Sequence, residues 1–511
     1  MEPSTSWELA PGAAIALSLP LAYVGYRFLK RPHPLDILPG PPSKSVIYGN
    51  AREFGRTRWS DATPFPEPFS TWMRDYGLAF HYRVLFYHRV ALADPVSLKH
   101  VLVTNAVNYP RSDVSRALLR NLTGGDGLLS SEDPTHAAQR KRLNPHFAHT
   151  VFKSYIPVFG QEVSRLAAEL DAVVTSKTPV HLPDLTTRLT LNIIGKTAFG
   201  YDFDAFDAQR AKSVIDAFEQ LNTPPRLLYT LGLIFIPGFR HWPLPYLEQI
   251  QRAKATLYKI VDDVVAHKLK APTAAADLLD LMLDGITPDE ARVHVMTFMF
   301  AGHETTSNSL CWVLGVLTRH PEVEQRVVRE CRQMLTRHDG MVTWDALAEL
   351  PYLTAVIHET LRLYPTALFI TARNCERDDY IPRTNAPPFL MPKGAHVSVS
   401  VGAIHRNPLY WTDPDMFCPD RFIEGSREHE ADKALRDGKG NTFVFMPFSA
   451  GTKNCIGKRF AIAEMQTALA LLLPKYAFKL TPDAVLHPKM TGVTIKPSNL
   501  CMTVEARPTE P

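Results

Sequence analysis

The loop sequence Phe448-Ser-Ala-Gly451-Thr-Lys453-Asn-Cys455-Ile-Gly457 places one cysteine between two glycines. Good helix formers follow from Lys458 to Leu473, and Pro474 stops the run. Cys455 is therefore predicted at or just before a helix N-terminus, where the helix dipole and free backbone N–H groups favour the thiolate. The two glycines let the backbone pass close to a flat ligand or turn with a positive φ.

A thiolate held in this way is a ligand for a soft or borderline metal, and haem iron is one such metal. For Cys455 taken alone, a buried core cysteine is the competing interpretation. The complete pattern Phe-x-x-Gly-x-Lys-x-Cys-x-Gly resembles the haem-binding loop of the cytochrome P450 family, the haem-thiolate monooxygenases. The resemblance implies that Cys455 is the axial ligand of haem b (iron protoporphyrin IX), in a loop that includes Phe448, Gly451, Lys453 and Gly457.

Composition and charge are those of a globular protein. The chain has 511 residues, of which 45% are hydrophobic and 21% are charged, and this length allows a large core. The net charge of +4 is too small to indicate a nucleic-acid partner. The six cysteines are scattered without a Cys-x-x-Cys pair, so they indicate neither a disulfide framework nor a zinc site, and a reducing compartment is favoured.

The N-terminal segment from about Leu9 to Leu29 is mostly apolar and is long enough to span a bilayer. Basic residues lie at its C-terminal end, which predicts a cytosolic body by the positive-inside rule. A cleaved signal peptide is the alternative, but no basic region precedes the apolar segment. We therefore expect a single-pass anchor at residues 1–31, a proline-rich linker, and a catalytic domain over residues 32–511 in the endoplasmic reticulum membrane.

Hydrophobic periodicity predicts a mainly α arrangement with small β-sheets (α+β), the fold that the resemblance also implies. A β-hairpin is expected within residues 78–98, and further β-prone patches lie near residues 366–373 and 491–505. No internal repeat or composition shift indicates a second domain. Helices are predicted at residues 135–147, 160–176, 186–198, 247–268, 288–319, 321–337 and 353–363.

The longest predicted helix is opened by the capping box Thr287-Pro-Asp-Glu290, with proline at its first position. The run continues to about Arg319 and is nearly all apolar between Val295 and Ala301, so the helix is expected to cross the core. Small and polar residues, Ala301-Gly302-His303-Glu304-Thr305-Thr306, stand in its middle. Buried polar residues are unfavourable unless they have a role, which marks this segment as a candidate site.

Within this segment, Gly302 would leave room for a ligand, and Glu304 and Thr305 could carry protons to it. Thr305 could also donate to the carbonyl of Ala301 and bend the helix. A structural polar patch is the alternative, whereas a zinc-protease His-Glu-x-x-His motif is excluded by Ser307. The segment resembles the oxygen-binding bend of the cytochrome P450 family, which implies catalytic roles for Glu304 and Thr305 beside the haem.

A second helical motif, Glu359-Thr-Leu-Arg362, has the spacing of an ordinary solvated ion pair. Apolar neighbours and Pro365 make it resemble the family's Glu-x-x-Arg motif instead. That resemblance implies a buried network with a third residue, for which Arg421 in Phe417-Cys-Pro-Asp-Arg421-Phe422 is the candidate. The implied role is structural, on the haem side of the fold.

Basic residues are needed for the two haem propionates. His136 and Arg140 are four residues apart and resemble a haem-facing helix of the family, while Arg373 matches its usual propionate arginine. Lys453 stands where arginine or histidine is commoner in the family; it keeps the charge but loses the fork geometry. Each of these side chains alone would more often be an ordinary surface residue.

The chemistry implied by the resemblance is monooxygenation with O2. Because no flavin or nicotinamide fingerprint is present, the electrons are expected from NADPH through a membrane-bound NADPH-cytochrome P450 reductase, with cytochrome b5 as a second possible partner. Lys453, Lys458 and Arg459 are expected to contribute to a basic docking face. The alternatives are an isomerase or dehydratase with the same fold, a non-catalytic haem-binding sensor or transport protein, and a degenerate structural protein.

The substrate pocket implied by the resemblance is mostly apolar, which favours a lipophilic small molecule. It is expected to be formed by the loop around residues 112–128 and by residues near 298–301, 367–371 and 491–493. The individual candidates are Phe298, Ala301, Ala367, Thr371 and Gly492.

Overall fold

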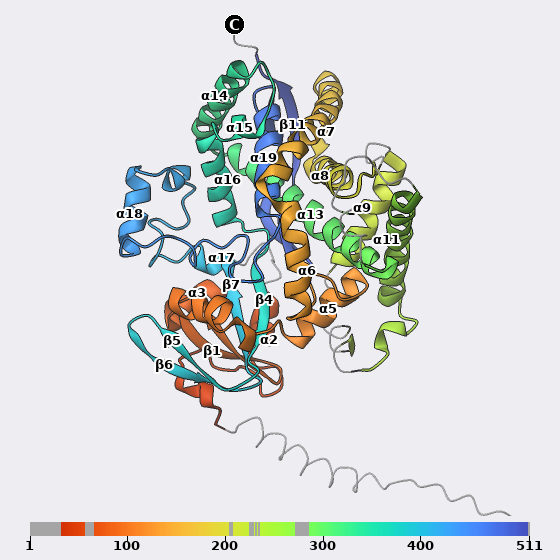
Figure 1. Cartoon of the computed structure of the whole chain (residues 1–511). Helices are drawn as coiled ribbons and strands as arrows, with labels where there is room; N and C mark the ends of the chain where they lie inside the picture. Colours follow the sequence, from red (N-terminus) through yellow and green to blue (C-terminus); the bar gives the residue numbers. More distant parts are fainter. Residues whose placement is uncertain are drawn as a thin grey trace, which may run out of the picture.

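The computed structural model describes residues 32–56, 66–203, 208–223, 236–270 and 286–508, together with residues 229, 232, 233 and 279. Figure 1 shows a helical region built around one long central helix and a smaller β-rich region at the lower left of the view. The predicted class, mainly α with small sheets, is confirmed.

The helices lie close to where periodicity predicts them, and several begin at a proline in the first turn. In chain order they are α2 (Ala51–Arg56), α3 (Phe69–Tyr76), α4 (Pro95–Lys99), α5 (Asp113–Thr123), α6 (Thr135–Leu143), α7 (His149–Ser176), α8 (Leu182–Phe199), α9 (Ala208–Asn222), α11 (Pro245–Lys270), α13 (Pro288–Leu317), α14 (Pro321–Arg337), α15 (Trp344–Leu347), α16 (Pro351–Leu363), α17 (Val401–Ile404), α18 (Arg427–Leu435) and α19 (Lys458–Leu472).

The largest boundary difference is in α7, which begins at His149 rather than at residue 160 and contains Pro157. The first turns are held by tertiary packing, because Phe152, Ile156 and Phe159 are almost fully buried in the main helical core. Burial of these side chains outweighs the low helix propensity of the proline.

The strands form four small sheets. The predicted hairpin consists of β1 (Ala79–Val84) and β2 (Tyr87–Leu92), and Asp94, which follows it, caps α4. In the same sheet, β2 pairs with β7 (His396–Ser400), and β7 pairs with β4 (Phe369–Asn374). The other sheets are β5 (Asp379–Arg383) with β6 (Ala386–Met391); β3 (Val180–His181), β11 (Cys501–Ala506) and β8 (Tyr476–Leu480); and β9 (Val485–Thr491) with β10 (Thr494–Asn499).

The central helix α13 begins with the predicted capping box. The Thr287 hydroxyl accepts from the Glu290 N–H at 3.2 Å, and the Glu290 carboxylate accepts from the Thr287 N–H at 2.9 Å. Most of its residues from Val295 onward are buried, and it packs extensively against α8. The expectation that this helix crosses the core is confirmed (Figure 1).

Two large apolar clusters, and a small third one of Trp312, Leu368 and Ile495, form the core of the described residues. One large cluster joins α7, α8, α13, α16 and α19, and the other lies around the four-stranded sheet and α3. Side chains of both large clusters, such as Phe298 from the first and Met446 from the second, line one cavity. The candidate site therefore lies at the junction of the helical and β-rich regions.

Membrane attachment was predicted for the apolar segment 9–29, which lies outside the residues that the structure describes. In the part of the chain that is described, every helix is too short or too polar to cross a bilayer.

Candidate functional site

The loop that carries Cys455 leads directly into α19. The Cys455 N–H donates to the Phe448 carbonyl at 2.9 Å, which closes the loop. Gly451 has a φ of +80°, and a Cβ there would lie 2.0 Å from the carbonyl oxygen of Leu102. Only glycine fits at this position, both for its backbone conformation and for the close approach of residue 102.

The second loop glycine has a different role. Gly457 has a φ of −84° and is the residue before the first turn of α19. A Cβ on Gly457 would lie 3.9 Å from the Cys455 sulfur, inside the cavity wall. Glycine at this position therefore keeps free the space beside the sulfur.

The thiol of Cys455 opens into the cavity and is otherwise surrounded by protein. Desolvation raises its pKa, while the Gly457 N–H and the charges of Arg140 and Lys458 act in the opposite direction. The helix terminus therefore favours the thiolate, as expected from the sequence, although the net shift of the pKa is upwards. Desolvation outweighs the backbone contribution; a metal ion would supply the missing positive charge.

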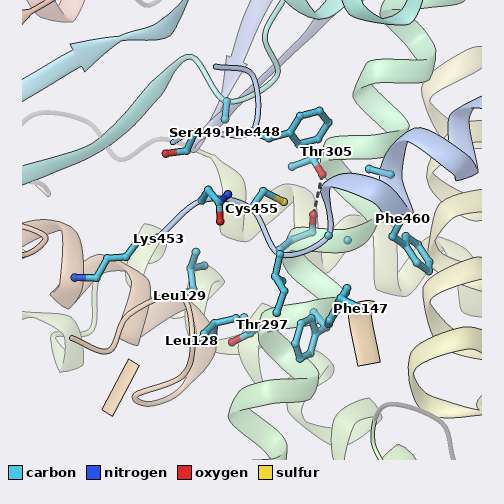
Figure 2. A pocket seen from close by; sticks show the side chains of 18 of the residues that line it. Leu128, Leu129, Phe147, Thr297, Thr305, Phe448, Ser449, Lys453, Cys455 and Phe460 are labelled. Carbon is cyan, nitrogen blue, oxygen red and sulfur yellow. Dashed lines mark hydrogen bonds between the residues drawn. The ribbon is translucent and has the colours of Figure 1, made fainter. Parts of the chain in front are cut away.

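The cavity has a volume of about 340 Å³. One wall is the cysteine loop, and the facing wall is the middle of α13 (Figure 2). The structure brings together most of the predicted site residues in its walls: Phe448, Lys453, Cys455, Gly457, His136, Arg140, Phe298, Ala301, Gly302, Thr305, Ala367 and Thr371.

Thr305 belongs to the wall opposite the cysteine loop. Its hydroxyl donates to the Ala301 carbonyl at 2.8 Å, as predicted, and its side chain borders the cavity. The hydroxyl keeps its acceptor lone pairs available for a molecule in the cavity. Thr305 is therefore a polar group of α13 that can hold a proton or a water molecule opposite the cysteine loop; Thr297 and Thr306 of the same helix also line the cavity.

Glu304 points elsewhere. Its carboxylate accepts from the hydroxyls of Thr494 at 2.6 Å and Thr491 at 3.1 Å, both on the β9–β10 hairpin, and it is absent from the described residues that line the cavity. The expected direct pair is thus replaced by one cavity-facing hydroxyl and one carboxylate bound to the hairpin.

Of two further predicted glycines, one lies at the cavity and one does not. Gly302 borders the cavity, and a Cβ there would lie 3.0 Å from Ile194 of α8, so the absent side chain also allows close helix packing. Gly492 forms the turn between β9 and β10 with a φ of +58°, and it is not among the described residues of the cavity wall. The hairpin reaches α13 through Thr494, which accepts from Asn308, on the far side of the helix.

The loop expected around residues 112–128 is mainly the helix α5. Of this segment, the described cavity wall includes only Leu128, with Arg111 just before the helix and Leu129 just after the segment.

A buried basic cluster lies at the polar end of the cavity; Arg111 is in the described wall, and Arg373, which is not, forms a β-bridge with Arg111. Arg373 is 4% exposed, and its Nε atom has no hydrogen-bond partner among the described residues. Burial, together with the nearby charge of Arg111, lowers the pKa of Arg373 to about 10. A buried cation whose donor is unsatisfied indicates a place for an anionic ligand.

Other members of this cluster have protein partners. Arg111 donates to Glu132 at 3.1 Å, and Lys453 forms an ion pair with the same carboxylate. Arg140 donates to the carbonyl and side-chain oxygens of Asn454, both at 2.6 Å. Sequence reasoning missed Arg111 and Glu132, because neither belongs to a motif and only the fold brings them to the cavity.

His136 completes this end of the cavity. Its ring is 3% exposed, and burial together with the charges of Arg111 and Lys453 lowers its pKa to about 4. A neutral imidazole can donate one hydrogen bond to a carboxylate without adding charge.

These residues fit a haem group. The cavity offers a soft sulfur ligand in Cys455, an apolar body, and a cluster of cations with an unsatisfied buried donor at Arg373. The donor set matches an iron porphyrin with two carboxylates. Cys455 would hold the iron, and Arg373, Arg140 and His136 would hold the carboxylates.

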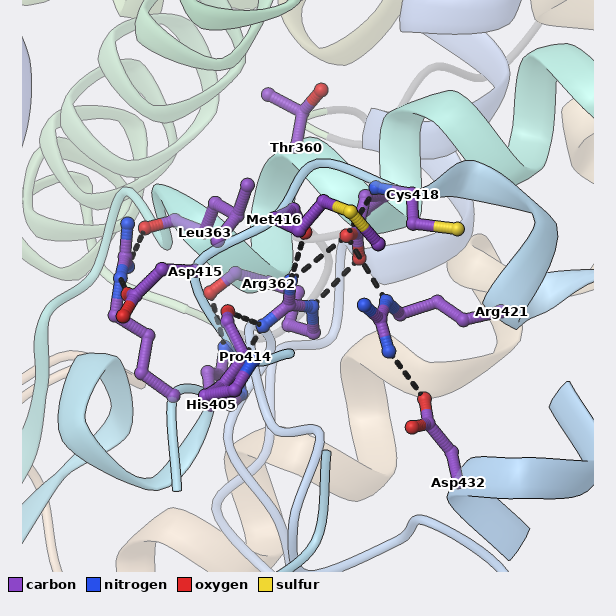
Figure 3. Close-up of polar contacts among 12 residues, drawn as sticks. Thr360, Arg362, Leu363, His405, Pro414, Asp415, Met416, Cys418, Arg421 and Asp432 are labelled. Carbon is purple, nitrogen blue, oxygen red and sulfur yellow. Dashed lines mark hydrogen bonds and ion pairs between the residues drawn. The ribbon is translucent and has the colours of Figure 1, made fainter. Parts of the chain in front are cut away.

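Beneath the cysteine loop lies the predicted charged network (Figure 3). Arg362 forms a two-pronged pair with Glu359, with distances of 2.7 and 2.8 Å, and Arg421 donates to Glu359 at 3.1 Å. The Glu359 and Arg362 side chains are 0% exposed and that of Arg421 is 2% exposed. The structure confirms that these three residues form a buried network and not a surface ion pair.

Two members of this network had no signal in the sequence. Asp432 of α18 pairs with Arg421 at 2.7 Å. His405 accepts from the Met446 N–H at 2.7 Å, and its carbonyl accepts from Arg362 at 2.8 Å. Because Met446 lies two residues before Phe448, His405 connects the charged network to the start of the cysteine loop.

Glu464 on α19 is a buried carboxyl close to the cavity. It is 1% exposed, and neither carboxyl oxygen has a hydrogen-bond partner within standard distances among the described residues. Burial raises the pKa of Glu464 well above its ordinary value, with the Thr306 hydroxyl acting weakly in the opposite direction. Burial therefore favours the protonated form of this carboxyl.

We predict that Glu464→Gln flattens the pH dependence of stability. The unfolded chain releases this proton near its ordinary pKa, so wild-type stability should fall as the pH rises above that value towards the folded pKa. Denaturant unfolding of the haem-loaded protein at pH 5, 6, 7 and 8 would measure the slope. The control is Glu322→Gln, whose side chain is 71% exposed; an unchanged slope for Glu464→Gln would show that Glu464 is ionised in the fold.

The sequence model described as Cytochrome P450 matches residues 39–504. Cytochrome P450 4F3 of Rattus norvegicus is 30% identical over 418 residues, which are 77% of this chain and 76% of the relative. Leukotriene-B4 omega-hydroxylase 3 of Mus musculus is 30% identical over 382 residues, 70% of this chain and 69% of the relative. The crystal structure of the cytochrome P450DA heme domain shares the fold with a TM-score of 0.75 and 26% identity, covering 92% of this chain and 98% of that one.

Proposed function

Because the chain belongs to the cytochrome P450 family and is a monooxygenase, we propose that it hydroxylates or epoxidises a lipophilic small molecule, using O2 and electrons from an NADPH-dependent reductase. The observation that supports this most directly is the position of Cys455 across one largely apolar cavity from Thr305. A soft metal ligand and a proton-holding hydroxyl on opposite walls are the two groups that oxygen activation requires.

Haem, when bound, supplies the oxygen-activating iron chemistry of this family. The side chains of the protein would bind and orient this group and hold a proton beside it. Cys455 would hold the group, and the basic cluster around Arg373 would bind its carboxylates. Thr305 holds a proton or a water molecule at the opposite wall of the cavity. Glu304 contributes indirectly, because its carboxylate holds the β9–β10 hairpin against α13.

We assign the substrate to lipophilic molecules with a long apolar part. Phe298, Ala301, Ala367 and Ile370 present apolar surface to the cavity. The mouse relative carries the name of an omega-hydroxylase of leukotriene B4, an apolar chain that ends in a carboxylate. Fatty acids and eicosanoids are therefore the first class to test.

For the redox partner, the expected docking face is smaller than the sequence indicated. The Lys453 side chain is only 6% exposed and is paired with Glu132, so it cannot contact another protein. Lys458 and Arg459, in the first turn of α19 directly after the cysteine loop, are exposed. We propose that these two cations meet an acidic surface of the reductase, at the endoplasmic reticulum membrane to which residues 1–31 would attach the chain.

Substrate class is tested by the spin-state change of the haem-loaded protein on titration with fatty acids, eicosanoids, terpenes, sterols and aromatics. We expect saturable shifts with the first two classes, and product formation only with reductase, NADPH and O2. Product formed from any of them without reductase would indicate an isomerase or dehydratase instead. If no compound of the panel caused oxygen consumption, the result would contradict the proposed hydroxylation or epoxidation.

For the proton-holding role of Thr305, we predict that Thr305→Ala binds haem normally but releases most of its electrons as peroxide. Loss of the hydroxyl removes a group of α13 that positions a proton at the cavity. The yield of product per NADPH should fall by about tenfold or more. Thr305→Ser, which keeps the hydroxyl, is the matched control; wild-type coupling in Thr305→Ala would show that another group delivers the proton.

A further inference from the structure

Three histidines lie together in the β-rich region, outside the described residues of the cavity wall. His33 precedes the short helix η1 (Pro34–Ile37), His81 lies on β1, and His88 lies on β2. One ring nitrogen from each lies within 4.8 Å of the others. Within the described residues, no other group of three histidine, cysteine or acidic side chains is this close.

The fold brings these rings together in two steps. In the β1–β2 ladder, His81 is opposite Val90 and Arg83 is opposite His88, so the two histidines are diagonal neighbours on one face. The N-terminal segment then crosses this face, where the His81 N–H donates to the Pro39 carbonyl at 2.9 Å. This crossing places His33 over the hairpin.

The distances between the nitrogens are close to those of metal ligands. His81 Nε2 lies 2.9 Å from His88 Nδ1. The ring of His33 lies on that of His88 with centroids 3.7 Å apart. Two imidazole nitrogens bound tetrahedrally to Zn²⁺ at 2.0–2.1 Å are roughly 3.3 Å apart, so the spacing suits the ion, while the stacked rings would have to rotate to direct their lone pairs at it.

Asp36 is placed as an outer partner of this cluster. Its Oδ1 lies 3.3 Å from His81 Nδ1, and its Oδ2 accepts from the His33 N–H at 2.7 Å. A carboxylate on one imidazole nitrogen directs the lone pair of the other nitrogen towards the cluster centre. The ring of His33 differs: its Nδ1 accepts from the Leu35 N–H at 3.2 Å, which places the proton of the neutral ring on Nε2, so His33 would bind a metal through Nδ1 in exchange for this contact.

The nearest cation, Arg83, is held away by other acceptors. Its guanidinium donates to the carbonyls of Leu85, Ser45 and Val46 at 2.6–2.7 Å. The carboxylate of Asp36 offsets part of its charge on the side of the histidines. The cluster thus offers three imidazole nitrogens and one nearby carboxylate, and imidazole is a preferred ligand of zinc.

We propose that His33, His81 and His88 form a zinc site that ties the N-terminal segment to the β1–β2 hairpin, with Asp36 as its outer-shell carboxylate. The fourth position would be taken by water. The site is structural: it fixes the segment that follows residues 1–31 against the body of the protein. The competing interpretation is a metal-free cluster held by ring stacking and the single contact between His81 and His88.

The test uses full-length, haem-loaded protein without a polyhistidine tag, treated with a chelator and then titrated with ZnCl2. We expect one equivalent of bound zinc by elemental analysis and a nitrogen–oxygen coordination shell with imidazole scattering at the zinc absorption edge. Zinc should also raise the thermal midpoint of the wild-type protein. The zinc edge is element-specific, so the haem iron does not interfere.

Variants separate the two interpretations. His33→Ala and His88→Ala should each weaken zinc binding by about 100-fold or more, and Asp36→Asn by about 10–100-fold. His320→Ala, at the start of α14, should leave binding unchanged, and the haem spectrum reports that each variant is folded. Failure to bind one equivalent, a sulfur-containing coordination shell, or wild-type affinity in both histidine variants would overturn the proposal.

Discussion

Replacing Cys455 with serine should leave a folded protein that binds haem poorly and has lost the thiolate-type spectrum of its reduced carbon monoxide complex. The loop itself should persist, because its closing contact is made by the Cys455 N–H and not by the side chain. A serine hydroxyl is a hard and weakly acidic ligand that cannot replace the sulfur. Monooxygenase activity should fall by about 100-fold or more, since even outer-shell changes at metal sites cost 10–100-fold.

The matched control is Cys501→Ser. Cys501 lies on β11, where its thiol contacts the Asn499 side chain, and it is not among the described residues that line the cavity. That variant should keep wild-type haem content, spectrum and activity. An unchanged carbon monoxide spectrum in Cys455→Ser would show that another residue is the iron ligand.

Features fixed by short spacing could be predicted from the sequence. The capping box at Thr287, the length of α13 and the pairing of Glu359 with Arg362 each depend on residues within one or a few helical turns. Local chemistry determines such elements, so a single sequence is sufficient to find them. The cysteine loop belongs to this class, because its glycine at residue 451 and its contact to Phe448 are internal to the motif.

Features that depend on tertiary approach could not be predicted. Glu132 pairs with Lys453, which is more than 300 residues away in the sequence. Asp432 pairs with Arg421 only because α18 packs back against that residue. His405 likewise reaches the cysteine loop through a single ring nitrogen. No periodicity or motif marks these residues, because each contact joins elements whose relative position is set by the whole core.

The direction of Glu304 is a third kind of feature. The motif marks Glu304 and Thr305 together, and Thr305 does line the cavity, whereas the Glu304 carboxylate accepts from the hydroxyls of Thr491 and Thr494. Because those partners lie on the β9–β10 hairpin, nearly 200 residues away in the sequence, no local pattern predicts this contact.

Removal of Arg362 should have the largest effect on stability. Its guanidinium satisfies both oxygens of Glu359 and the carbonyls of His405, Pro414 and Met416, all within 3.0 Å. Arg362→Ala leaves a buried carboxylate with one remaining charged partner, and breaking a buried pair in this way destabilises proteins by about 3–5 kcal/mol. We expect little haem-loaded protein, and a denaturant midpoint lowered accordingly in what remains.

Arg362→Lys sharpens this test, because it keeps the charge but cannot satisfy two carboxylate oxygens and three carbonyls at once. It should fold with an intermediate loss of stability and of haem affinity, since the same network supports His405 and, through it, the cysteine loop. Arg337→Ala is the control: its ion pair with Glu349 is 58% exposed on the arginine side, and exposed pairs contribute about 0–1 kcal/mol. Equal losses in Arg362→Ala and Arg337→Ala would mean that burial of the network adds nothing, and that the cysteine loop is held by its own backbone contacts.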